Sequence, residues 1–446
     1  LMIDLSPGII TILLFGGVLL GVFIGLPIAF VVGGVALVVG FLVFGEAVYP
    51  ILYQRLFFLI HNYTLVAVPL FIFMGIMLEH SGIADTMFDV LYMWLGGMRG
   101  GLAVVTVLVG TILAACVAII GASISMLALT ALPPMIKRGY DKALASGTVV
   151  ASGCLGILIP PSIMLVIYGP MAGISVGKLF MAAFFPGFLL SGLYMSFIAV
   201  KCFLNPELGP PSPLAERARV TLRRKTFLLF KSLFPPAIVI LSVLGVIFLG
   251  IAPPTEAAAI GAFVATLLAI AYGGFSWSVL KKTTVQTLRL GSMILLIGGL
   301  SFAFVGVFIR AGCDKVVANA IMASPGGKWG AFGIIMFIIF ILGFFIDWIG
   351  ILFIMIPVVS PVGQLMGFDP LWFGLMICVN LQTAFMTPPL AQGIFFLRGA
   401  APPELGIKMS DIIRGCVPFI VLVLVGLALC SAFPEIITWL PSKMIR

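Results

Sequence analysis

Charged residues are scarce in this sequence. Only 9% of its 446 residues are charged, whereas 62% are hydrophobic, and a soluble domain carries roughly a quarter charged residues. This deficit excludes an ordinary water-soluble fold. Apolar runs of about 20 residues, the length that crosses a bilayer, recur along the whole chain. The composition therefore predicts an all-α membrane protein with about 11 transmembrane helices, because open sheets cannot satisfy their edges in lipid.

Motifs for enzyme and nucleotide chemistry are also missing. The chain has only two histidines, no H-E-x-x-H sequence and no phosphate-binding P-loop. These absences argue against an enzyme and against an ATP-driven pump. The seven cysteines are an odd number and never occur in the spacing C-x-x-C. We interpret them as small core residues, so the sequence predicts neither a disulfide framework nor a transition-metal site.

Basic residues exceed acidic ones, 24 against 15, which gives a net charge of +9. They concentrate in loops and at the ends of apolar runs, as the positive-inside rule predicts for cytoplasmic segments. The main hydrophilic interruption, residues 201–232, is therefore expected to be a basic cytoplasmic linker, and no nucleic-acid partner is expected. The first apolar run lacks a preceding basic region and continues past residue 40, so we expect it to remain as a membrane span.

An internal duplication organises the chain. Slid by 228 positions, the Gly-aromatic-Asp turn at 139–141 falls on the one at 367–369, and Pro160-Pro161 falls on Pro388-Pro389. A fixed offset of this kind indicates two repeats, here 1–200 and 233–446. We expect Asp141 and Asp369 to act as helix N-caps. Parallel and inverted repeats both remain open, and inversion is favoured because it directs two interrupted segments at one midplane site.

The double prolines are expected to form the tips of two re-entrant helical hairpins, near 143–176 and 370–405. Such breaks at membrane depth leave main-chain carbonyls without helical partners. Oxygen ligands suit a small hard cation such as Na⁺. The alternative is that each hydroxyl only bonds its own helix backbone. The candidate cation ligands are Ser123, Gly153, Pro160, Ser162, Asn380, Thr383, Thr387 and Pro388, with Gln382 as a further candidate side chain.

Asp347 is the most informative single residue, because no other charge lies within many residues of it. A carboxylate at membrane depth marks an ion or substrate path by default. Its alternative is a structural pair with Arg310 or a backbone cap. Arg310 has a guanidinium suited to a carboxylate, but it also fits a helix-end arginine that reaches the interface, and Arg398 has the same two interpretations. The predicted substrate site comprises Ser123, Ser125, Arg310 and Asp347.

With these residues in view, the chain resembles the large membrane subunit of tripartite ATP-independent periplasmic (TRAP) transporters. The segments that carry the resemblance are 121–125, 139–141, 156–162 and 380–389. The resemblance implies a Na⁺-coupled, elevator-type secondary transporter in a bacterial inner membrane. It also implies an organic acid substrate, such as a C4-dicarboxylate or sialic acid, delivered by a periplasmic substrate-binding protein. A small four-helix membrane subunit is expected as a separate protein, with membrane lipids around both.

The resemblance also implies a division into a static scaffold and a moving transport unit. Carried over by position, the scaffold comprises 1–64, 178–200 and 233–289. The transport elements are 65–177 and 290–410, followed by a terminal helix at 411–433. Two alternatives stay open at this point: a stand-alone Na⁺ or H⁺ carboxylate symporter that needs no binding protein, and a membrane scaffold or assembly factor without transport. No residue identifies the organic acid.

Overall fold

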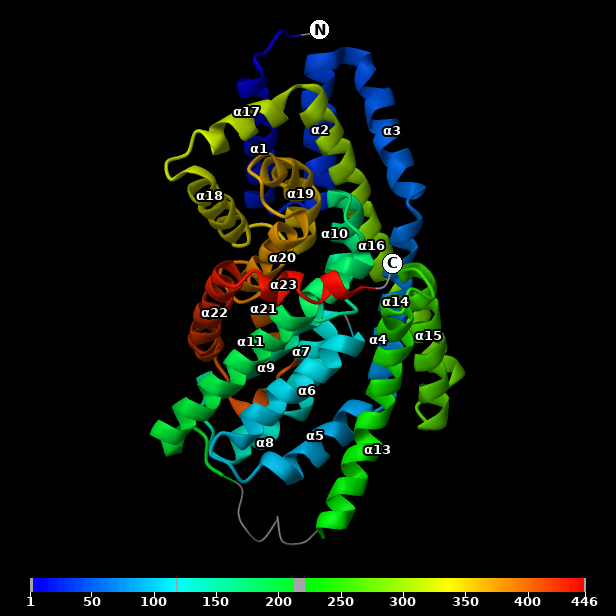
Figure 1. The fold of residues 1–446 in the computed structure, drawn as a ribbon, viewed down its shortest axis with the longest axis vertical. Helices are drawn as coiled ribbons and strands as arrows, with labels where there is room; N and C mark the ends of the chain where they lie inside the picture. The colour runs from blue at the N-terminus through cyan, green and yellow to red at the C-terminus, as the bar shows by residue number, and fades with distance from the viewer. Residues whose placement is uncertain (1–2, 118, 212–220, 445–446) are drawn as a thin grey trace.

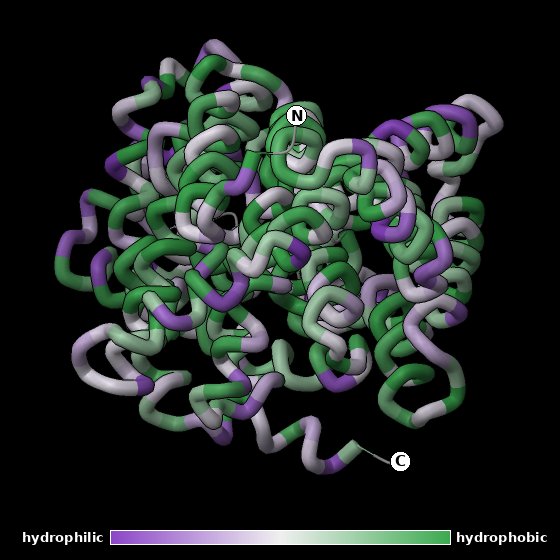
Figure 2. Tube along the Cα trace, turned by 90° about the horizontal axis from the view of Figure 1, so that it is seen from above, coloured by the Kyte–Doolittle hydropathy of each residue, from purple (hydrophilic) through white to green (hydrophobic). Residues whose placement is uncertain are grey.

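The computed structural model describes residues 3–117, 119–211 and 221–444, and all regular structure in these ranges is helical (Figure 1). Hydrophobic residues cover most of the trace (Figure 2). Eight described helices are long and apolar enough to cross a membrane, and shorter apolar helices of 10–17 residues accompany them. The all-α polytopic architecture expected from composition is thereby confirmed. All seven cysteines are buried, as expected for core residues.

The first repeat runs from α1 to α11. Its elements are α1 (Pro7–Phe23), α2 (Ile28–Phe44), η1 (Gly45–Ala47), α3 (Val48–Ile60), η2 (Tyr63–Val66), α4 (Ala67–Glu79), α5 (Ile83–Leu95), α6 (Gly101–Val117), α7 (Ile120–Thr130), α8 (Leu132–Lys137), α9 (Lys142–Cys154), η3 (Leu155–Ile157), α10 (Ile163–Ala172) and α11 (Val176–Leu204), followed by η4 (Pro206–Leu208). Part of the predicted linker, residues 212–220, lies outside the described residues.

The second repeat follows the same order. Its elements are α13 (Leu222–Ile240), η5 (Leu241–Gly245), α14 (Val246–Phe248), α15 (Pro254–Ala271), α16 (Trp277–Arg310), α17 (Cys313–Met322), α18 (Gly327–Leu342), α19 (Trp348–Leu365), α20 (Pro370–Asn380), η6 (Leu381–Phe385), α21 (Gln392–Ala400), η7 (Pro403–Leu405), α22 (Met409–Ala432), α23 (Glu435–Thr438) and η8 (Pro441–Lys443). The first residues of α7 and α9 map at the 228-residue offset onto those of α19 and α20.

Each repeat contains a helical hairpin, but at a different place from the predicted one. In the first repeat α6 runs in one direction, and α7 and α8 run back beside it. The evidence is that the Tyr140 hydroxyl, just after α8, accepts a hydrogen bond from the Leu102 N–H at the start of α6, at 3.2 Å. In the second repeat α18 enters and α19 returns, and the rings of Trp329 and Phe368 pack 5.5 Å apart at the open end. The aromatic residue of each Gly-aromatic-Asp turn therefore closes the open end of a hairpin.

The first double proline instead interrupts a helix that passes through the molecule. The Asp141 N–H, at the start of α9, donates to the carbonyl of Leu208 just beyond the end of α11. With 29 residues, α11 is about 43 Å long if straight, and it begins four residues after α10 ends. The end of α10 therefore lies far from the start of α9, and the prediction of a re-entrant hairpin at 143–176 is wrong.

The second double proline behaves in the same way. The indole Nε1 of Trp372, near the start of α20, donates to the carbonyl of Cys430 at 3.0 Å, near the end of α22. The 24 residues of α22 span about 36 Å and begin shortly after α21, so the prediction of a hairpin at 370–405 is also wrong. The physical reason is that a proline break ends a helix without deciding whether the next helix turns back or continues.

Packing between the repeats is reciprocal. The contact of α2 with α16 is matched by that of α15 with α4, that of α10 with α19 by that of α21 with α7, and that of α9 with α22 by that of α20 with α11. This exchange is what an approximate two-fold relation between the repeats produces. The inversion of the repeats relative to the bilayer stays a prediction. In this packing α11 contacts α6, α10, α20 and α22, and the assignment of 178–200 to a static scaffold stays a prediction.

Both predicted N-caps are confirmed. The Asp141 carboxylate accepts the N–H of Leu144 and the Asp369 carboxylate accepts that of Trp372, each at 2.8 Å. We expect Asp369→Ala to lower the free energy of unfolding by about 1 kcal/mol, because an N–H of the first turn loses its acceptor. Asp369→Asn should retain most of the stability. Thermal unfolding in detergent measures both, and equal losses for the two variants would contradict the capping role.

Candidate functional site

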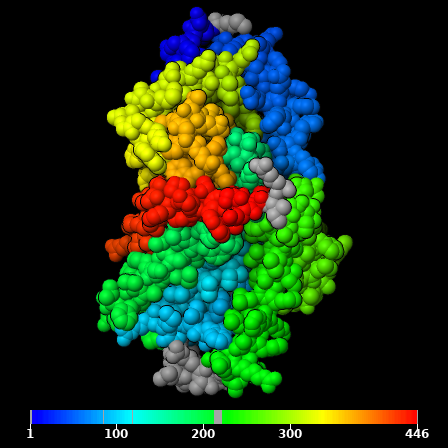
Figure 3. Space-filling view, in the orientation of Figure 1, coloured from blue at the N-terminus to red at the C-terminus, as the bar shows by residue number. Residues whose placement is uncertain are grey.

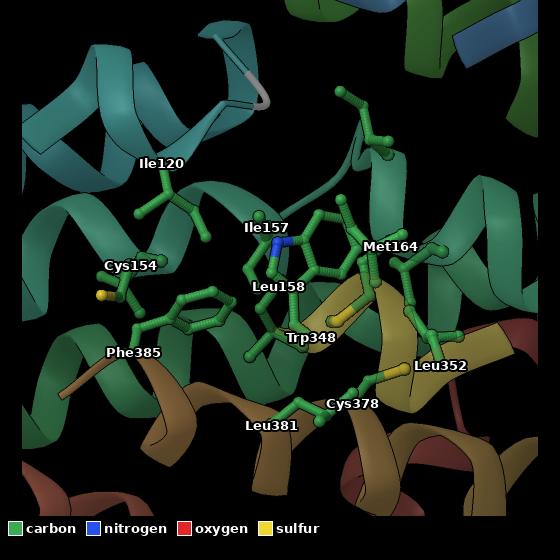
Figure 4. Packing of buried hydrophobic residues seen from close by; sticks show 14 of the residues in the cluster. Ile120, Cys154, Ile157, Leu158, Met164, Trp348, Leu352, Cys378, Leu381 and Phe385 are labelled. Carbon is green, nitrogen blue, oxygen red and sulfur yellow. The ribbon is translucent and has the colours of Figure 1, made fainter. Parts of the chain in front are cut away.

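Helix breaks from both repeats meet around one central cavity of about 140 Å³. Figure 4 shows the packing beside it, where Ile157 and Leu158 of the first double-proline break face Trp348 of α19 and Phe385 of η6. The rings of Trp348 and Phe385 lie 6.4 Å apart. The cavity is lined by Ile72, Ile119, Ile120, Gly121, Ile157, Ile163, Leu290, Met293, Ile294, Asp347, Trp348, Ile349, Gln392 and Phe396.

Four helices begin at this cavity. The lining includes the first helical residues of α7, α10, α19 and α21, which are Ile120, Ile163, Trp348 and Gln392. The first N–H groups of a helix have no intrahelical acceptors, and the helix dipole places partial positive charge there. Four such ends around one cavity create a favourable environment for an anion without a lysine or arginine in the lining.

Among the described residues, Asp347 is the only charged one that lines the cavity. It occupies the N-cap position of α19 but makes no cap hydrogen bond, and its buried Oδ1 has no hydrogen-bond partner among the described residues. The Gln392 side chain and the N–H groups of Trp348 and Ile349 lie beside the carboxylate. Arg310 lines a separate pocket, so the structure shows no pair between it and Asp347, whereas the first N–H groups of α19 stay close enough for the backbone-cap alternative to remain open.

Oxygen atoms concentrate at the first double-proline break. The Oγ of Ser123 is buried without a hydrogen-bond partner and lies next to Gly156. The Ser162 hydroxyl donates to the carbonyl of Ile157 and accepts the N–H of Leu165 at 3.5 Å, which leaves one acceptor lone pair on this oxygen. No described donor bonds the carbonyls of residues 158–161. The buried Pro160 thus belongs to a stretch of main-chain oxygens available to a cation.

The second break has a similar supply of oxygens. Thr383 donates to the Asn380 carbonyl and Thr387 to the Thr383 carbonyl, each at 2.7 Å. Both hydroxyls therefore donate to their own helix backbone, as the alternative interpretation expects. Each oxygen still has lone pairs that could accept a hydrogen bond or bind a cation. The buried Gln382 has no partner for either amide atom, whereas Asn380 donates to the carbonyl of Met336 at 2.7 Å.

The two breaks also differ. Pro388 is exposed, whereas Pro160 is buried. No described donor bonds the carbonyls of residues 386–390, so this break likewise has main-chain oxygens to offer. Among the described residues, no group of three or more His, Cys, Asp or Glu could hold a metal ion. A cation at either break would therefore be held mainly by neutral oxygens.

Among the predicted and candidate site residues, Asp347 alone lines the cavity. Four of the others have the following surroundings. Ser125 is half-buried on α7, and Arg310 lines a separate pocket together with Arg55. Arg398 lies in another hollow, where its Nη1 donates to the carbonyl of Ile407 at 2.6 Å. At Gly153 a Cβ would lie 2.3 Å from the Cγ1 of Ile124, so close packing of α7 on α9 explains this glycine. Their assignments to substrate or cation stay predictions.

Several lining residues were not predicted. Leu290, Met293 and Ile294 belong to α16, whose polar start resembles an interfacial segment and gave no sign of a central position. Gln392 had a usable signal, since it is the only amide between the second double proline and Arg398. The residue types of Trp348 and Phe396 gave no such signal, because aromatic residues are common throughout the chain.

Comparisons with known proteins agree with this architecture. Residues 15–436 match the family model for the tripartite ATP-independent periplasmic transporter, DctM component. The chain is 29% identical to the C4-dicarboxylate TRAP transporter large permease protein of Pseudomonas aeruginosa, over 87% of this chain and 88% of that protein. It is 27% identical to the sialic acid TRAP transporter permease protein of Haemophilus influenzae, over 88% of this chain but 62% of that longer protein.

A solved structure has the same fold. The crystal structure of the Alcanivorax borkumensis YdaH transporter matches with a TM-score of 0.62 and 15% identity, over 89% of this chain and 90% of that one. Members of the matched family are permeases that work with a small membrane subunit and a periplasmic binding protein. The family model matches residues 15–436, and the apolar helices and the relatives agree with that match. The chain therefore belongs to the DctM family as a multi-pass large permease subunit of a TRAP transporter in a bacterial inner membrane.

Proposed function

We propose that this permease subunit imports an organic acid anion and that Na⁺ moves with it. The observation that carries the proposal is the convergence of four helix N-termini on one cavity. Apart from Asp347 and Gln392 the lining side chains are apolar, so the N–H groups of these helix ends and the Gln392 amide would be the main donors to a carboxylate. A small organic acid with an apolar body and an anionic end fits such a lining.

Na⁺ coupling follows from the charge of the same cavity. A carboxylate substrate entering beside Asp347 would be repelled at low dielectric unless a cation offset the charge. The unbonded carbonyls of 158–161 and 386–390, together with Ser123, Thr383 and Thr387, offer oxygen ligands at the two double-proline breaks. A hard monovalent cation bound there would make anion binding dependent on Na⁺, which is the requirement for symport.

The position of the cavity supports an elevator mechanism. Breaks of the hairpins and discontinuous helices form most of its lining, and α4 and α16 contribute the remaining lining residues. A site at such a boundary would open to one side of the membrane or to the other if the hairpins and discontinuous helices moved against α4 and α16. C4-dicarboxylates and sialic acids, which the relatives' names specify, are the substrate classes to test first. In this proposal a periplasmic binding protein delivers the substrate.

The test uses the complete complex in proteoliposomes, with small subunit and binding protein, and compares uptake under a Na⁺ gradient with uptake under a K⁺ gradient. We expect uptake only with Na⁺. Ser123→Ala should raise the Na⁺ concentration for half-maximal uptake roughly tenfold, the equivalent of one lost oxygen ligand. Ser146→Ala is the matched control, since this buried serine already donates to the carbonyl of Lys142.

Several outcomes would count against the proposal. Uptake that proceeds equally in K⁺ would reject Na⁺ coupling. An unchanged Na⁺ dependence in Ser123→Ala would remove the first break from the cation site. Uptake that persists without the binding protein would favour the stand-alone symporter. Absence of uptake for every organic acid offered would contradict the proposed substrate class.

A further inference from the structure

A second polar pocket lies at the corner formed by the end of α2, the start of α3 and the end of α16. Its volume is about 560 Å³, and it is separate from the central cavity. In Figure 3 the segment containing α3 forms the outer edge of the molecule. The pocket is lined by Phe44, Ala47, Pro50, Ile51, Gln54, Arg55, Gly306, Ile309 and Arg310.

Two arginines line this pocket, and no acidic side chain in the lining neutralises their positive charge. Within the described ranges neither Arg55 nor Arg310 has an ion-pair or hydrogen-bond partner. Each guanidinium carries five N–H donors and no acceptor. Two like charges at one pocket repel each other unless an anion lies between them, so the pocket is chemically incomplete as it stands.

Gly306 positions one of these arginines. It lies on α16 one turn before Arg310, and a Cβ added to it would lie 2.7 Å from the Cγ of Arg55 and 3.3 Å from its Nε. The Arg55 side chain therefore passes directly over the α16 backbone, and a larger residue at position 306 would force this side chain to shift. This contact brings the guanidinium of α3 to the same pocket as that of α16.

The surroundings place the pocket at the level of lipid headgroups. Tyr49 and Tyr53 lie one turn apart on α3 and are 55% and 66% exposed, and Phe41 packs near Tyr49 with ring centroids 6.4 Å apart. Exposed tyrosines of this kind are enriched at the membrane interface. Basic pockets between membrane helices are known to bind anionic headgroups.

We propose that Arg55 and Arg310 bind a phosphate-type anion, supplied by an anionic phospholipid headgroup. The two guanidinium groups would hold the phosphate oxygens by charge-assisted hydrogen bonds. The bound acyl chains would lie along the exposed apolar face of α3. This site is distinct from the transport cavity and holds regardless of which organic acid is transported.

The experiment measures lipid retained by the chain purified with its small subunit. Native mass spectrometry quantifies phosphatidylglycerol and phosphatidylcholine after incubation with vesicles of each lipid. We expect phosphatidylglycerol to be retained selectively, and Arg55→Gln/Arg310→Gln to reduce its retention roughly tenfold through lost charge-assisted bonds. Arg289→Gln is the control, because it removes the same charge from an exposed position of α16 and should retain the lipid.

Gly306→Ala provides an independent variant if the double substitution fails to fold. It displaces Arg55 without removing a charge, and we expect weaker phosphatidylglycerol retention. A second arm adds inorganic phosphate to lipid-depleted protein and follows the thermal unfolding midpoint. Stabilisation by phosphate that depends on both arginines, without lipid retention, would support the anion site with a soluble occupant. Equal retention in the wild type and all variants, with no effect of phosphate, would overturn the proposal.

Discussion

Asp347→Asn is expected to reduce Na⁺-driven uptake by on the order of 100-fold, which corresponds to about 2.7 kcal/mol. The substitution preserves the shape of the side chain but removes the only charge lining the central cavity. In the proposed mechanism this charge makes anion binding depend on the coupling cation. Its loss therefore separates anion binding from Na⁺ binding, and the Na⁺ gradient no longer drives uptake. The measurement is the initial rate of uptake by the reconstituted complex under a Na⁺ gradient.

The same variant should be more stable than the wild type. A buried carboxylate oxygen without a partner raises the free energy of the folded state, and a neutral amide removes much of that penalty. Opposite changes in uptake and in thermal unfolding midpoint separate a functional residue from a structural one. Asp314→Asn is the matched control, because Asp314 also has a buried, unpartnered oxygen but does not line the cavity. Unchanged uptake in Asp347→Asn would contradict the assignment.

Gly147→Ala is expected to destabilise the fold by roughly 3 kcal/mol or more, because overpacking here has no flexible side chain to displace. A Cβ at Gly147 would lie 2.0 Å from the carbonyl oxygen of Gly415, and a Cβ at Gly415 would lie 2.0 Å from that of Ala143. The two helices, α9 and α22, therefore touch through their backbones. Because α9 leads directly into the first double-proline break, separating the helices should also disturb the cation site.

The thermal unfolding midpoint and the yield of folded protein in detergent measure this effect. Gly16→Ala is the control: it lies in α1, and a Cβ there meets nothing within 4 Å. That change should be neutral or slightly stabilising, since alanine favours helix more than glycine does. Similar midpoints for Gly147→Ala and the wild type would show that α9 and α22 can separate without loss, contrary to the close contact described here.

The helix breaks and one residue of the cavity, Asp347, could be located from the sequence. The charge deficit required a membrane protein, and the 228-residue offset located both repeats, both N-capping aspartates and both double-proline breaks. Asp347 was recognised because an isolated carboxylate in an apolar run is costly wherever the run lies in the membrane. These features depend on local composition and spacing, so they needed no knowledge of contacts.

The path of the chain after each break was decided by long-range packing. Pro160-Pro161 and Pro388-Pro389 mark the ends of helices, but the contacts of Tyr140, Asp141 and Trp372 show that α9–α10 and α20–α21 continue through the molecule. The convergence of four helix N-termini likewise exists only after the two repeats have packed. Amino-acid spacing constrains where a helix stops, whereas its direction in space depends on partners distant in the chain. For that reason the sequence could group Arg310 with Asp347 in one predicted substrate site, whereas in the fold Arg310 lines a separate pocket.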